Sequence, residues 1–128
     1  MRRRNALLLS LTFFAAVAQA REAKLDDPRP GGRLSARERS LCEAPEAYPG
    51  WCEQAHEVRA FLQRYDLCEH WRGEEAPPGD KRRRKEIAEG ANGACKGNDR
   101  RLTELRRRYR NDPAAAALLS QLEFNGGP

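Results

Sequence analysis

Large apolar residues recur every three or four positions along the second half of the chain, and no stretch alternates strictly between apolar and polar residues. The first such stripe is typical of one face of an amphipathic helix. We predict this helix from about Glu53 to Asp66. Its stripe consists of Val58, Phe61, Leu62 and Tyr65.

A second stripe follows Asp80, which stands where a helix N-cap belongs. At about 100° per residue, its members fall within an arc of about 100° and favour one long helix, straight or kinked. Three glycines oppose this helix, each by about 1 kcal/mol relative to alanine. The alternative is a break near Gly97, with Asn98 or Asp99 capping a new helix. The stripe consists of Ile87, Ala91, Ala94, Cys95, Leu102, Leu105 and Tyr109.

The last predicted helix begins with Asp112 as its N-cap and Pro113 in its first turn, where the fixed φ of proline suits a helix. The closing sequence "NGGP" ends it. Its apolar stripe consists of Ala115, Leu118, Leu119 and Leu122.

The sequence therefore predicts an all-α fold, a small disulfide-stapled bundle of three to four helices over residues 41–124. Residues 21–40 contain two prolines, many charges and only Leu25 and Leu34 as large apolar residues, which predicts a disordered leader. Residues 125–128 are predicted to form a flexible tail.

The first twenty residues have the layout of a secretory signal peptide. Three arginines precede an apolar run from Ala6 to Ala18, and "AQA" ends at Ala20, where we expect cleavage. The run is shorter than the roughly 20 apolar residues that cross a bilayer, so no stable membrane insertion is expected after cleavage. We predict an exported protein, either periplasmic or secreted.

Four cysteines in an exported chain predict two disulfides, which would compensate for a small core. Cys52 and Cys68 flank the first predicted helix, about 24 Å apart, too far for a bond. Two pairings remain open: Cys42–Cys52 with Cys68–Cys95, or Cys42–Cys68 with Cys52–Cys95. We favour the first, because it closes a loop that contains Pro45, Pro49 and Gly50.

A metal site is the competing interpretation of the same residues. Cys52 and His56 lie four positions apart, and Cys68 and His70 could add two ligands. Oxidised cysteines bind zinc poorly, and the spacing matches no zinc finger or ribbon. We therefore predict no metal and no cofactor.

Charge is distributed unevenly along the chain. The whole chain carries 24 Lys and Arg against 19 Asp and Glu, and removal of the signal peptide leaves a net charge of +2. Residues 81–110 carry 12 basic and 4 acidic residues, whereas residues 21–80 carry 9 basic and 13 acidic residues. On the long helix, one face opposite the apolar stripe is basic and consists of Arg82, Lys85, Lys96, Arg100, Arg107 and Arg110.

This basic face predicts a non-catalytic binding protein whose partner is an anionic envelope component or a protein, with nucleic acid excluded by the exported location. A solvated face is the simpler interpretation of the same cations. The alternative function is a small extracytoplasmic hydrolase in which His70 acts with Glu74 or Glu75. We expect no enzyme, because these residues fall in the surface stretch "LCEHWRGEEAPPG". The sequence does not predict an oligomeric state.

Overall fold

The computed structural model describes residues 29–127, and within this range every regular element is helical. The all-α prediction is therefore confirmed, with four helices of at least eight residues and two disulfides. The predicted signal peptide lies outside the described residues. In chain order the elements are α1 Ala36–Leu41, the 3-10 helix η1 Trp51–Glu53, α2 His56–Gly73, α3 Lys81–Cys95, α4 Asn98–Arg108 and α5 Pro113–Ser120.

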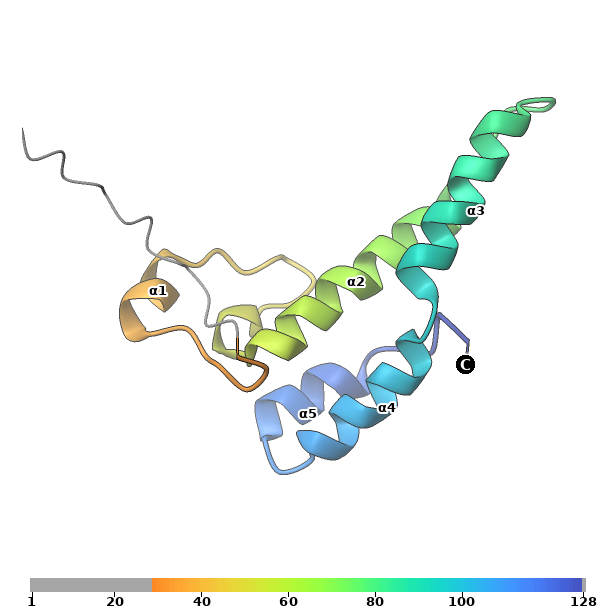
Figure 1. Cartoon of the computed structure of the whole chain (residues 1–128). Coiled ribbons are helices and arrows are strands. Elements are labelled where there is room, and N and C mark those ends of the chain that lie inside the picture. Colours follow the sequence, from red (N-terminus) through yellow and green to blue (C-terminus); the bar gives the residue numbers. More distant parts are fainter. Residues whose placement is uncertain (1–28, 128) are drawn as a thin grey trace, which may run out of the picture.

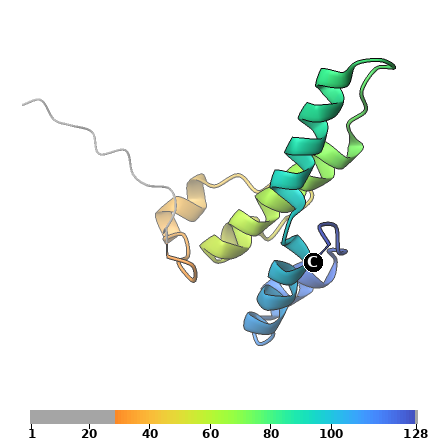
Figure 2. The same ribbon diagram turned by 45° about the vertical axis from the view of Figure 1, so that its right-hand side comes forward.

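Two parts of the molecule differ in shape (Figure 1). Helices α4 and α5 lie beside each other below the first half of α2, and we call this part, together with the N-terminal segment, the body. The second half of α2 and α3 form a hairpin that projects away from the body, as the rotated view also shows (Figure 2). We call residues 68–95 the hairpin arm.

The main core lies in the body, where α2 packs against α4 and α5. Val58, Leu62, Leu105 and Leu119 have no exposed surface there. These are the positions that the apolar stripes predict to be buried, so the stripes are confirmed for these helices. A second, smaller cluster lies in the arm and consists of Cys68, Ala94 and Cys95, with Trp71 and Ala91 against it.

The N-terminal segment is folded where the sequence predicts a disordered leader. The N-cap of α2, Ala55, has no side chain that can accept a hydrogen bond, and two backbone carbonyls of the segment serve instead. Gly32 O accepts from His56 N at 2.7 Å, and Pro30 O accepts from Glu57 N at 2.9 Å. Leu34 is buried, and α1 begins two residues later. The leader prediction is therefore wrong for residues 29–40, while residues 21–28 lie outside the described range.

The single long helix that the apolar stripe favours is not formed. The chain ends α3 at Cys95 and starts α4 at Asn98, with Gly97 between them at φ 80°. This left-handed conformation suits glycine and stops a helix. Gly97 itself is the N-cap of α4, rather than Asn98 or Asp99.

The stripe stays in phase across this break because both helices bury it, against different neighbours. The Ala94 and Cys95 end of α3 packs near Cys68, whereas Leu102 and Leu105 of α4 pack in the body core. Arg64 also stabilises the break, since it donates to Asn98 Oδ1 at 2.8 Å and to Lys96 O at 2.7 Å.

Helix α2 extends to Gly73, seven residues beyond its predicted end. The first half of "LCEHWRGEEAPPG" is therefore helical, and the connection to α3 consists of residues 74–80 only. The extension follows from Cys68 and Trp71, which both pack toward α3. The predicted N-cap role of Asp80 is confirmed, because its carboxylate accepts from Arg83 N at 2.8 Å.

The C-terminal region combines a confirmed prediction with an incorrect one. Asp112 caps α5 and accepts from Ala115 N at 3.1 Å, with Pro113 in the first turn, as predicted. Residues 125–127, in contrast, are not a flexible tail. Asp99 Oδ1 accepts from Asn125 N at 2.9 Å and from Gly126 N at 2.8 Å. A Cβ at Gly126 would lie 1.9 Å from Cys95 O, so only glycine permits this approach.

Candidate functional site

The cysteines form the pairing that the sequence analysis favours. Cys42 bonds to Cys52 with their Cα atoms 6.0 Å apart, and Cys68 bonds to Cys95 with Cα atoms 4.8 Å apart. The first disulfide closes the turn before α2, and the second joins the middle of α2 to the end of α3. Two disulfides are typical of proteins that fold in an oxidising, extracytoplasmic environment.

Above the second disulfide, one aromatic residue fills the space between the two helices of the arm. Trp71 of α2 lies so close to Gly90 of α3 that a Cβ there would be 2.4 Å from the indole. Arg83 lies over the same ring at 5.9 Å and also pairs with Glu74 at 2.5 Å. Arg83 thus ties the start of α3 to the end of α2.

The free end of the arm carries a cluster of cations. We call residues 74–85 the hairpin tip. The exposed side chains of Lys81, Arg82 and Arg84 have no hydrogen-bond or ion-pair partner among the described residues. Lys85 is 78 % exposed and lies 3.7 Å from Glu89. The first turn of α3 contains no acidic residue, whereas Glu86 and Glu89 lie beside Arg82 and Lys85 farther along the helix.

The basic face predicted for one long helix is divided between separate surfaces. Arg82 and Lys85 lie at the hairpin tip, whereas Arg100 and Arg107 lie on the exposed side of α4 and Arg110 follows that helix. Lys96 lies in the break between the helices. Since α3 is about 21 Å long, the tip and the α4 cations form two patches at different ends of this helix. The structure therefore does not bring the six predicted residues onto one face.

The residues of the alternative hydrolase lie on the open surface of the arm. His70 Nε2 is 3.6 Å from Glu74 Oε1, and the His70 side chain is 59 % exposed. Glu74 also pairs with Arg83, and Glu75 is exposed. None of the three lines a described pocket. The structure thus places His70 next to Glu74 on the surface of the arm, with Glu75 following in the connection to α3.

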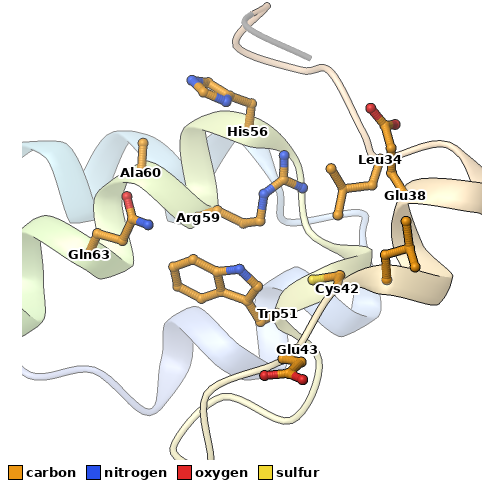
Figure 3. Close-up of a pocket in the computed structure, with 10 residues that line it drawn as sticks. Leu34, Glu38, Cys42, Glu43, Trp51, His56, Arg59, Ala60 and Gln63 are labelled. Atoms are coloured by element: carbon orange, nitrogen blue, oxygen red, sulfur yellow. The ribbon is translucent and has the colours of Figure 1, made fainter. Parts of the chain in front are cut away.

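A pocket of about 300 Å³ lies at the opposite end of the molecule, between the N-terminal segment and the start of α2. Leu34 lies next to Arg59 of α2, and the Trp51 ring lies on the other side of Arg59 (Figure 3). Glu38 and Ala60 also line the pocket. Leu41 also lines this pocket and is 65 % exposed. The sequence analysis did not predict this pocket, because its lining comes from three separate stretches of the chain, residues 34–43, 51 and 56–63. The remaining lining residues are Cys42, Glu43, His56 and Gln63.

A buried carboxylate near this end also escaped the sequence analysis. The Glu57 side chain is 4 % exposed and accepts hydrogen bonds from Arg101 at 3.1 Å, from Arg108 at 2.5 Å and from Tyr109 Oη at 2.7 Å. Burial raises the pKa of Glu57, but the hydrogen bonds from Arg108 and Tyr109 and the two arginine charges outweigh it, so this pKa lies below its ordinary value. Burial and the Glu57 contact raise the pKa of Tyr109 to about 12. This network joins α2 to α4.

The described residues contain no group of three or more His, Cys, Asp or Glu side chains that could hold a metal ion. The two cysteines of the alternative zinc site, Cys52 and Cys68, are both in disulfides. Between residues 29 and 127 we also find no helix with the length and apolar character needed to cross a bilayer.

Comparison with known proteins gives no further guide to the site, since no protein-family model, no curated protein and no solved structure shows significant similarity to this chain.

Proposed function

We propose that this chain is an exported, periplasmic or secreted, non-catalytic binding protein whose hairpin tip binds an anionic component of the cell envelope. The single observation that carries the proposal is the unpaired cation cluster of the tip, on an arm that adds little to the core. From Lys81 to Gly90 no residue of α3 is buried.

Stability does not explain this cluster. Cations in the first turn of a helix interact unfavourably with the helix dipole, by about 0.3–1 kcal/mol each, and neighbouring cations repel one another. A sequence under selection for stability alone would place acidic residues there. A function that uses the cations offsets this cost.

The geometry suits contact with a flat or extended anion. The tip is the outermost part of the arm in both views (Figures 1 and 2). The disulfide and the Trp71–Arg83 stack hold it rigidly, so little conformational entropy is lost on binding. Among envelope anions we choose phosphate-bearing lipid head groups, because a lipid surface presents many phosphates to one protruding tip.

The test is binding of the oxidised protein to vesicles that contain phosphatidylglycerol, with pure phosphatidylcholine vesicles for comparison. Each Lys or Arg near such a surface contributes about 1 kcal/mol, so Arg82→Gln with Arg84→Gln should weaken binding on the order of 30-fold. Arg100→Gln with Arg107→Gln is the matched control, with the same charge change on α4, and should weaken it far less. An equal loss of vesicle affinity in the two double variants would reject the tip as the binding surface.

A further inference from the structure

The loop that precedes α2 is acidic, and its first glutamate, Glu43, lines the pocket beside α1. Residues 43–53 contain three glutamates and no basic residue. Glu43, Glu46 and Glu53 are exposed, and their carboxylates have no partner among the described residues. The pocket thus combines apolar side chains, among them Trp51 and the exposed Leu41, with the carboxylates of Glu38 and Glu43 and the Arg59 side chain, and it lies beside the acidic loop.

The hairpin tip has the complementary properties. Its apex is the sequence "APPG" at residues 76–79, in which Pro77 and Pro78 are both exposed. Five cations, at residues 81–85, follow this apex after Asp80. Proline segments dock onto aromatic-lined grooves because the proline ring packs flat on an aromatic face and loses little entropy. An apolar apex followed by a run of cations therefore matches an apolar pocket beside an acidic loop.

The two surfaces lie too far apart to meet within one molecule. The pocket is lined by His56, at the start of α2, whereas the tip begins after Gly73, at its end. An 18-residue helix is about 27 Å long, and the tip extends farther still (Figure 1). Any contact between them must join two molecules.

We propose that the hairpin tip of one copy docks into the pocket of a second copy. Pro77 and Pro78 pack against Trp51 and Leu41, and the tip cations face Glu43 and its neighbours. The contact is head to tail, so a pair of copies keeps one free tip and one free pocket, and further copies can add to a ring or an open chain.

This inference goes beyond the proposed function, although both use the tip. Self-association needs the acidic loop and the pocket, whereas lipid binding needs neither. The lipid and the second copy compete for the same cations, so phosphatidylglycerol vesicles should dissociate the assembly.

The experiment is sedimentation equilibrium of the oxidised protein over a range of concentrations, at low and high salt. We expect the mean mass to rise with concentration, and this rise to weaken with added salt, which screens exposed charges. Leu41→Ser, at an exposed position, should raise the dissociation constant by about tenfold or more. A monomer at every concentration would overturn the proposal.

Two charge-reversed variants make the test specific. Glu43→Lys with Glu46→Lys carries a basic loop, and Arg82→Glu with Arg84→Glu carries an acidic tip. Each should be monomeric alone, because its loop and its tip now carry like charges. An equimolar mixture should associate again, because every tip then meets a loop of opposite charge.

The same variants separate the two proposals. The loop variant should keep vesicle binding and lose self-association, whereas the tip variant should lose both. The tip variant could lose vesicle binding while the native protein shows no self-association. That result would retain the proposed function and reject this inference. Association of the native protein that neither variant changes would locate the contact elsewhere and also reject it. Far-ultraviolet circular dichroism confirms that each variant keeps its helices.

Discussion

Leu62 in the body and Ile87 in the arm each belong to an apolar stripe of the sequence, but only Leu62 is fully buried. The body is stabilised mainly by apolar burial between α2, α4 and α5. The arm is held by one disulfide, one indole and one arginine. The comparison shows how a chain with few large apolar residues can extend a rigid element far from its core: covalent and stacking contacts replace burial there.

The largest expected effect tests the body. Leu62→Ala removes a side chain with no exposed surface and should lower the free energy of unfolding by about 3–5 kcal/mol. Leu67→Ala on the same helix is the matched control, since this residue is 49 % exposed, and should change it by less than about 0.5 kcal/mol. Urea denaturation measures both. Similar losses in the two variants would contradict the assigned core.

The second prediction compares the two disulfides. Loop-closure entropy predicts losses of about 3.5 kcal/mol for Cys68–Cys95, which spans 27 residues, and about 2.7 kcal/mol for Cys42–Cys52, which spans 10. Alanine at both positions of each pair tests this by urea denaturation. Hydrogen exchange should quicken in the arm only when Cys68–Cys95 is removed. Faster exchange spread evenly over the body would argue against a separately fixed arm.

The third prediction concerns the Glu57 network that joins α2 to α4. Because the folded pKa of Glu57 lies below its ordinary value, its contribution is complete above pH 4.5 and is lost as pH falls through the lower folded value. Glu57→Gln should lower the free energy of unfolding by about 1–3 kcal/mol at neutral pH. It should also make the loss of stability at acid pH less steep. Thermal unfolding from pH 2 to 7 measures it. If the variant lost stability at acid pH as steeply as the native protein, that loss would belong to other carboxylates.

The same network also makes the stability depend on pH in the alkaline range. The pKa of Tyr109 is raised to about 12 from an ordinary value of 10.0, so the tyrosine stabilises the fold fully below pH 10 and loses its effect as pH rises through 12. Tyr109→Phe should reduce this alkaline loss.

The smallest effects compare two glycines of α3. Gly90→Ala would drive a methyl group into Trp71, so we expect a loss of about 1–2 kcal/mol and a shift in tryptophan fluorescence. A Cβ at Gly93 would meet no atom within 4 Å. Gly93→Ala should therefore raise the free energy of unfolding by up to about 1 kcal/mol, because alanine favours the helix. Thermal unfolding distinguishes them. A gain at both positions would mean that Trp71 does not pack on Gly90.

Local signals in the sequence predicted much of this fold. Asp112 and Pro113 start α5 as expected, and the cysteine spacing favours the pairing that is formed. The break at Gly97 was only the alternative in the sequence analysis, because both helices bury the stripe in the same phase and periodicity alone cannot separate them. The order of residues 29–40 depends on carbonyls that meet α2 more than twenty residues later, a contact that no local pattern encodes.

The candidate site was predicted only in part. The cations of residues 81–85 stand out in the sequence, but which of them are paired depends on Glu74 and Glu86, and on the way the arm folds back. The pocket and its lining were not predictable, because Leu34, Leu41, Trp51 and Ala60 meet only in the folded chain.

The central claim is that the tip cations serve binding rather than stability. The most direct measurement is the free energy of unfolding of Arg82→Gln with Arg84→Gln, determined beside its affinity for phosphatidylglycerol vesicles. We predict a stability equal to or above that of the native protein, together with a large loss of affinity. Lower stability with unchanged affinity would contradict the claim.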